Sequence, residues 1–171
     1  MPTYSIRTAR ADELLAVQEI ERRATTRFVS VGLAEAVNLP IQSIESLRAD
    51  RDQGRLLVSA DEEDRPVGFA VFDLHEDEAF LREIDVVPEH AGNGLGRRLI
   101  QEVIAMAREA GLPRLTLATY RDVPFNAPFY SRLGFRVVDE THMPPRLARL
   151  RQEERQDGRE IAPRVAMVLE L

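Results

Sequence analysis

The spacing of apolar and polar residues changes several times along the chain, and each change marks an expected element. Continuous or alternating apolar runs predict strands, whereas stripes at three- and four-residue spacing predict helices. In the first half we expect a strand at 3–9, a helix capped by Asp12 with an apolar face reaching Phe28, a loop or short helix at 29–40, a helix from Ser43 to Asp52, and strands at 56–60, 67–74 and 79–87. The polar turns at 61–66 and 75–78 are typical of antiparallel hairpins.

The second half opens with a helical stripe formed by Leu95, Leu99, Val103, Ala107 and Ala110. Gly111 and Pro113 then predict the end of that helix. Further elements are expected as a strand at 114–120, a short helix at 126–135, a strand at 135–140, a helix at 145–156 and a strand at 164–171. The strand–helix–strand unit at 79–120 predicts a right-handed crossover between parallel strands. We therefore predict an α/β fold in a single domain over 1–171, with a mixed sheet that is antiparallel in its N-terminal half.

Composition limits the class of protein and the cellular compartment that we expect for such a domain. The 171 residues are 44% apolar and 30% charged, a balance typical of globular domains. No apolar run approaches the roughly 18 residues that a membrane span needs, and MPTYSIRTAR lacks the apolar core of a secretory signal. The chain has no cysteine, which excludes disulfides and thiolate metal sites. We expect a cytoplasmic protein with no metal.

Charge limits the classes of partner. The net charge of −6 argues against nucleic acid or an anionic membrane as the main partner, although a local basic patch could bind an anionic cofactor. All 23 basic side chains are arginine. A composition bias of the genome explains this without reference to function.

The stretch PEHAGNGLGRRL, residues 88–99, carries the clearest chemical signal. Gly92, Gly94 and Gly96 lie between a predicted strand and a predicted helix, where glycine permits backbone angles that side chains forbid. The first amides of a helix have no partner within it and favour an anion such as phosphate. Arg97 and Arg98 add positive charge nearby. The alternative is a tight turn without a ligand, and neither the Walker nor the dinucleotide glycine pattern fits the spacing.

The stretch IDVVPEHAGNGLGRRLIQEVI, followed about 30 residues later by NAPFYSRLGF, resembles the GNAT superfamily of acyl-CoA-dependent N-acyltransferases. The order of expected elements agrees with that family over nearly the whole chain. The family's loop signature is Arg/Gln-x-x-Gly-x-Gly/Ala, which this sequence matches at Gly94 and Gly96. Ala91 stands at the Arg/Gln position, so the main-chain cradle is retained while one side-chain contact to the cofactor is lost.

The resemblance implies acetyl-CoA as cosubstrate. It implies that the loop and the following turn bind the pyrophosphate, through Ala91, Gly92, Asn93, Gly94, Leu95, Gly96, Arg97 and Arg98. It also implies a splayed central parallel pair, with strands 79–87 and 114–120 diverging at their carboxyl ends. The pantetheine arm would lie in that gap, bonded by the amides of Val86 and Val87. Asn126 is open to two interpretations, a cofactor contact or the cap of the following short helix.

Acetyl transfer also needs a proton donor for the departing thiolate and a route for the ammonium proton. Tyr130 in FYSRLGF matches the family's general acid; the alternative is an aromatic at the edge of the core. Glu83 is our candidate base, because it lies one alternation from Asp85 near the expected gap. An exposed residue paired with arginine is the alternative for Glu83. The rival bases are Asp85, His90 and Asp122. Many members of the family carry a base on the strand at 114–120, but the matching position here is Ala118, which has no group that could accept a proton.

The expected reaction is therefore acetyl transfer from acetyl-CoA to a primary amine of a small molecule. One alternative is a peptide or protein N-terminal acetyltransferase. A second alternative, from another class, is a non-catalytic CoA-binding sensor or self-associating scaffold. No motif in the sequence identifies the acceptor amine. The sequence also does not decide whether the protein forms a homodimer.

Overall fold

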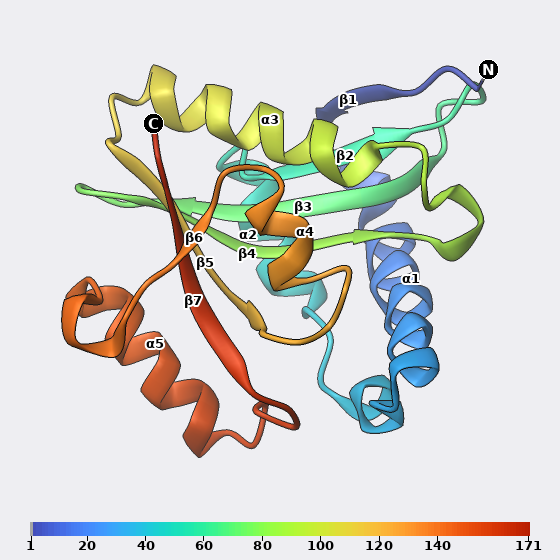
Figure 1. Ribbon diagram of the computed structural model, residues 1–171. Helices are drawn as coiled ribbons and strands as arrows, with labels where there is room; N and C mark the ends of the chain where they lie inside the picture. Colours follow the sequence, from blue (N-terminus) through green and yellow to red (C-terminus); the bar gives the residue numbers. More distant parts are fainter. Residues whose placement is uncertain (1) are drawn as a thin grey trace. The chain divides into compact units, whose positions relative to one another are not determined.

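The computed structural model describes residues 2–171 (Figure 1). This part of the chain divides into two compact units, which we describe one at a time. Unit 1 comprises residues 2–73 and 81–106, and unit 2 comprises residues 74–80 and 107–171. In hydrogen-bonding order the strands of the described chain run β1-β2-β3-β4-β5-β7-β6. The expectation of a single domain stays a prediction.

Unit 1 holds the antiparallel part of the sheet and the helices packed with it. Its elements are β1 (Ser5–Thr8), α1 (Leu14–Ala24), α2 (Ile44–Asp52), β2 (Leu56–Ala60), and the greater parts of β3 (Pro66–Leu74), β4 (Ala79–Val86) and α3 (Leu95–Glu109). Strands β1 and β2 pair antiparallel from Ser5↔Ala60, and β2 pairs antiparallel with β3 from Leu56↔Val71. These pairings confirm the predicted antiparallel N-terminal half.

The core of unit 1 follows directly from the apolar pattern. Leu14, Val17 and Ile20 lie on one face of α1, because helix positions three and four apart share a face. They pack in one buried cluster with residues of β2, β3 and β4 and with Leu95 at the start of α3. This cluster fixes the point where β4 leads into α3, the region of the glycines.

Unit 2 contains β5 (Arg114–Tyr120), α4 (Ala127–Ser131), β6 (Arg136–Val137), α5 (Pro145–Gln156) and β7 (Arg164–Glu170). The first residues of β4 pair parallel with β5, Ala79 with Leu115 and Phe80 with Thr116. Strand β7 then pairs antiparallel with β5 from Arg114↔Glu170 to Tyr120↔Arg164. The predicted parallel pair is confirmed, and its divergence towards the carboxyl ends stays a prediction.

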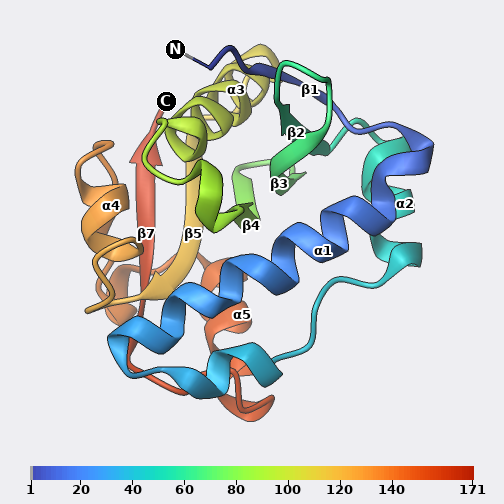
Figure 2. The same ribbon diagram turned by 90° about the vertical axis from the view of Figure 1, so that its right-hand side faces the viewer.

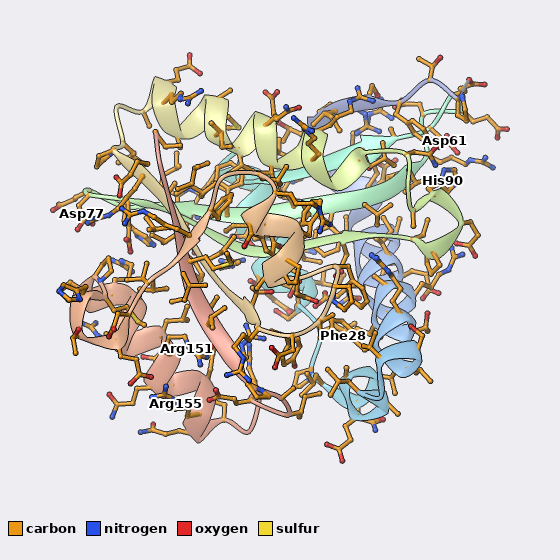
Figure 3. All side chains as sticks on the ribbon, viewed as in Figure 1. Phe28, Asp61, Asp77, His90, Arg151 and Arg155 are labelled. Atoms are coloured by element: carbon orange, nitrogen blue, oxygen red, sulfur yellow. The ribbon has the colours of Figure 1, made fainter. Side chains whose placement is uncertain are left out.

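A buried arginine anchors α5 to β7 in unit 2 (Figure 3). Arg151 is only 3% exposed, and its guanidinium contacts Glu154, donates to Glu160 at 3.0 Å and donates to the Arg164 carbonyl at 3.2 Å. Arg164 in turn donates to Glu154 at 3.0 Å and lies 4.8 Å from the centre of the Tyr120 ring. A buried charge is tolerated only when it is paired and hydrogen-bonded in this way.

Several element ends differ from the expected ones. Helix α1 stops at Ala24, and 3₁₀ turns, η2 (Thr25–Val31) and η3 (Ala34–Asn38), follow it towards α2 (Figures 1 and 2), so Phe28 lies outside the helix. Asp12 lies inside a 3₁₀ turn and does not cap α1, because the N-cap position of that helix is Glu13, whose side chain accepts the Arg10 amide at 2.7 Å. The expected helix at 126–135 shortens to α4, and the strand at 135–140 shortens to β6.

Candidate active site

The glycine loop, residues 91–94, connects the 3₁₀ turn η4 (Pro88–His90) to α3 in unit 1. Gly92 has φ +81° and Gly94 has φ +74°, in the left-handed region that residues with a side chain rarely adopt. A Cβ built on either glycine would meet no atom of the described chain within 4 Å. Backbone conformation therefore explains both glycines, and the space above them stays open to a ligand.

Helix α3 begins directly after these glycines and supplies a main-chain anion site. The Arg98 amide donates to the Gly94 carbonyl at 3.0 Å, which starts the helical bonding pattern. The amides of the first helical turn precede that pattern and carry the positive end of the helix dipole. Leu95 is buried and Gly96 lies within the first turn, so the predicted cradle is held by the core beneath it.

Arg97 and Arg98, the two arginines of the first turn, differ in their contacts. Both are exposed, but the Arg98 guanidinium donates to the Tyr4 carbonyl at 2.8 Å, so it is tied to the chain before β1. The Asn93 side chain donates to the His90 carbonyl at 3.0 Å within the loop. The structure thus gives Arg98 and Asn93 a role in shaping the loop, and their contact with a cofactor stays a prediction.

Val86 and Val87, at the end of β4, are both buried. The Val87 amide donates to the Val67 carbonyl of β3 at 2.9 Å and is thus engaged within the sheet. A bond from this amide to a pantetheine arm would first require the Val67 bond to break. The expected bonds from Val86 and Val87 to a cofactor stay predictions.

Asp85 lies in a cluster of carboxylates in unit 1. Glu83 and Asp85 share a face of β4, because strand side chains alternate. Burial, followed by the charges of Glu83 and Glu21, raises the pKa of Asp85 well above its usual range, and the Arg27 guanidinium opposes that rise. A carboxyl with a raised pKa can exchange a proton near neutral pH, which is the property a general base requires.

Sequence reasoning missed two residues of this cluster, Glu21 and Arg27. Glu21 is 6% exposed on α1 and accepts the Gln42 amide at 3.0 Å, while Arg27 lies on η2. The sequence does contain one signal that Glu21 is buried: it follows Val17 by four positions and thus lies on the apolar face of the helix. Of the other rival bases, His90 contacts Tyr4, and Asp122 lies on the surface of unit 2 in an ion pair with Arg121.

Tyr130, the predicted proton donor, lies on α4 in unit 2. Its side chain is 7% exposed, and its ring makes edge contacts with Phe129 and Phe135 at 5.3 and 5.7 Å between centroids. The Phe135 amide donates to the Tyr130 carbonyl at 3.2 Å and fixes the turn that follows α4. The ring is thus packed among other aromatic side chains, and its role as a proton donor stays a prediction.

Asn126, just before α4, carries an unsatisfied acceptor. Its Nδ2 donates to Thr119 Oγ1 of β5 at 2.7 Å, so the side chain does not cap the helix and that interpretation is wrong. Its Oδ1 is buried and has no hydrogen-bond partner within the described residues. Because a buried acceptor without a partner is costly, this atom fits a donor on a bound ligand, such as an amide N–H.

Residues 2–171 contain no group of three or more His, Cys, Asp or Glu side chains that could hold a metal ion. In the same part of the chain, no helix combines the length and the apolar character needed to cross a membrane.

Comparison with known proteins gives a family and a fold. The model of the acetyltransferase (GNAT) family matches residues 15–135. A curated relative, the [ribosomal protein bS18]-alanine N-acetyltransferase of Haemophilus influenzae, is 29% identical over 97 residues. That match covers 57% of this chain and 66% of the relative, slightly under two thirds of its length.

Among solved structures, the PaiA N-acetyltransferase of Thermoplasma acidophilum in complex with coenzyme A is similar with a TM-score of 0.74 and 17% identity, over 99% of both chains. The ribosomal-protein-S18-alanine N-acetyltransferase of Escherichia coli gives a TM-score of 0.68 and 20% identity, over 98% of this chain and 94% of that one. The N-acetylglutamate synthase of Neisseria gonorrhoeae, complexed with coenzyme A and N-acetyl-glutamate, gives 0.73 and 20%, over 99% of this chain and 35% of that one. At these identities the likeness is one of fold, and it confirms the predicted α/β class.

Proposed function

The chain belongs to the acetyltransferase (GNAT) family, and from that premise we propose that it transfers an acetyl group from acetyl-CoA to a primary amine of a small molecule. Membership confirms the superfamily and the N-acetyltransferase class that the sequence predicts. The cosubstrate, the acceptor and the roles of single residues are proposals. So are the cytoplasmic location and the homodimer.

The observation that carries the proposal is the glycine loop before α3. Two left-handed glycines with open space above them precede a 15-residue helix, so main-chain amides can approach a phosphate closely. The unsatisfied Oδ1 of Asn126 is a second feature that fits coenzyme A, whose pantetheine arm carries amide donors. Similar structures described as complexes with coenzyme A support the same cosubstrate.

The chemistry needs two proton movements, and the chain has a group for each. An alkylammonium has a pKa of about 10, so its proton must leave before the nitrogen can attack the thioester carbon. Glu83, with Asp85 beside it, receives that proton directly or through a water. As the carbon–sulfur bond breaks, Tyr130 gives its phenolic proton to the departing thiolate. Both residues are partly or fully shielded from water, which favours such exchanges.

A second candidate acceptor is the N-terminus of a protein. The curated relative from H. influenzae is named as an enzyme that acetylates the alanine of ribosomal protein bS18, and it shares 29% identity over 97 residues. The carboxylates near Asp85 would suit a peptide α-ammonium as well as a small amine. The acceptor must therefore be decided by assay.

The deciding experiment measures release of free CoA thiol from acetyl-CoA with two acceptor panels. One panel holds small primary amines, and the other holds short peptides with free and with blocked N-termini. Turnover confined to small amines supports the proposal, whereas turnover confined to free peptide N-termini overturns it in favour of the second acceptor. CoA binding in a calorimeter without turnover on any acceptor would favour the non-catalytic sensor.

A further inference from the structure

The side chain and main chain of Tyr4 contact residues on either side of the glycine loop, His90 before it and Arg98 in the first turn of α3. Tyr4 lies just before β1 and is largely buried. Its hydroxyl is 2.9 Å from Nδ1 of His90, and the two rings meet edge to face with centroids 5.7 Å apart. His90, labelled in Figure 3, is the residue directly before the loop. One residue near the chain's start is thus bonded to a position 86 residues away.

The second contact of Tyr4 reaches the other end of the loop. Its carbonyl oxygen accepts a hydrogen bond from the Arg98 guanidinium at 2.8 Å, and Arg98 belongs to the first turn of α3. Asn93, inside the loop, donates to the His90 carbonyl at 3.0 Å. His90 and Arg98, which lie on either side of residues 91–96, are therefore both hydrogen-bonded to Tyr4.

Within the described residues, the Ala91 amide also donates to the Pro88 carbonyl at 3.1 Å. Ala91, Gly92, Asn93 and Gly94 are all exposed, and a glycine backbone has more freedom to lose on ordering than any other. A binding loop that is ordered before its ligand arrives loses less affinity to that ordering. We infer that Tyr4 is a positioning residue, which holds residues 91–96 in the shape that binds the CoA pyrophosphate. This rests on the proposed function, because it presumes that the loop binds CoA.

The test compares Tyr4→Phe, which keeps the ring contact and removes the hydroxyl, with His90→Ala and the double variant. One hydrogen bond contributes about 0.5–1.5 kcal/mol, so Tyr4→Phe should raise the Kd for CoA roughly two- to tenfold. The KM for acetyl-CoA should rise with it, while kcat at saturating acetyl-CoA stays unchanged. If the bond to His90 carries the effect, Tyr4→Phe should change nothing further in the His90→Ala background.

Hydrogen exchange of residues 91–96 is measured in the protein without CoA, where Tyr4→Phe should accelerate it. Ile6→Val is the matched control, because it perturbs β1 at a half-buried side chain and should alter neither exchange nor Kd. Unchanged exchange in Tyr4→Phe overturns the inference even if the wild-type protein binds no CoA. Faster exchange with an unchanged Kd also overturns it, whereas failure of the wild-type protein to bind CoA defeats the proposed function itself.

Discussion

Glu83 and Asp85 are neighbouring carboxyls on one face of β4. The pKa of Asp85 is raised first by burial and then by the charges of Glu83 and Glu21. When two carboxyls interact this closely, the protons leave in steps that belong to the pair. Either residue can thus hold the proton that the acceptor loses, and mutation at each separates their roles.

Glu83→Gln should lower kcat/KM at pH 7 and be partly rescued near pH 9, where more amine is already free. The wild-type profile should rise with pH, with its midpoint above the usual range of a carboxyl pKa, because burial and the neighbouring carboxylates raise the pKa of Asp85 and the base acts only when ionised. Steady-state rates from pH 5.5 to 9.5 measure both effects. Full activity of Glu83→Gln, together with inactive Asp85→Asn, would assign the base to Asp85.

Tyr130→Phe should affect turnover and leave CoA affinity nearly unchanged. We expect kcat to fall by about ten- to a thousandfold, a range below and within typical acid–base contributions, because the ring contacts with Phe129 and Phe135 remain while the hydroxyl that donates the proton is removed. Stopped-flow rates measure the change in kcat, and calorimetric titration with CoA measures the affinity. Wild-type turnover in this variant would mean that another group protonates the thiolate.

Among the elements, α3 and its preceding loop carry the clearest consequence for binding. Gly94 has φ +74°, and a side chain there would strain the backbone and enter the space proposed for the ligand. Gly54, between α2 and β2, has φ +70° and equally open surroundings, yet it lies far along the chain from the loop. The two glycines form a matched pair for mutation.

Gly94→Val should weaken CoA binding severely, by at least tenfold, a loss of about 1.4 kcal/mol. Gly54→Val should cost similar folding stability because its backbone is equally strained, and it should leave the Kd for CoA unchanged. Isothermal titration and thermal melts of both variants give the comparison. Equal affinity of Gly94→Val and the wild-type protein would refute binding at the loop.

Elements with a strong local pattern were predictable from the sequence, and contacts between distant residues were not. Strands β2 and β5 and helix α5 have the predicted ends because their apolar spacing is unambiguous and turn residues bound them. Helix α1 was predicted too long, because the apolar Phe28 continues the stripe although the backbone has already turned to 3₁₀. The Asn126–Thr119 bond, the Glu21–Asp85 interaction and the Tyr4–His90 bond join separate elements, so no local pattern reports them.

At the scale of the whole molecule, stability should depend on a buried acid that the proposed chemistry does not use. Glu78, directly before β4 in unit 2, is fully buried, and neither carboxylate oxygen has a hydrogen-bond partner within residues 2–171, although Oε2 lies 3.5 Å from Nε of Arg114. Burial raises the pKa of Glu78, with Asp77 adding to the rise and Arg114 and Arg146 opposing it. Because the folded pKa exceeds the unfolded one, the contribution to stability is full at low pH and is lost as pH rises through the folded pKa.

Glu78→Gln should therefore raise the free energy of unfolding by about 1 kcal/mol at pH 8, since a neutral amide replaces an unsatisfied buried charge. The gain should shrink towards pH 4, where the wild-type carboxyl is protonated. Urea unfolding at pH 4, 6 and 8 measures it, with Glu76→Gln as the exposed control in the same turn. A variant less stable than wild type at pH 8 would show that the ion contact with Arg114 dominates.

The guanidinium network around Arg151 also has a chemical consequence for a protein exposed to an activated thioester. Every basic side chain in the sequence is arginine, which stays protonated and does not act as a nucleophile. Lysine ε-amines, the usual targets of adventitious acylation, are absent from the sequence. The ion pairs that fasten α5 to β7 are therefore inert to acyl donors, because none of them contains a primary amine. Mass spectrometry after reaction with an amine-directed reagent should consequently find no acylated side-chain amine within residues 1–171.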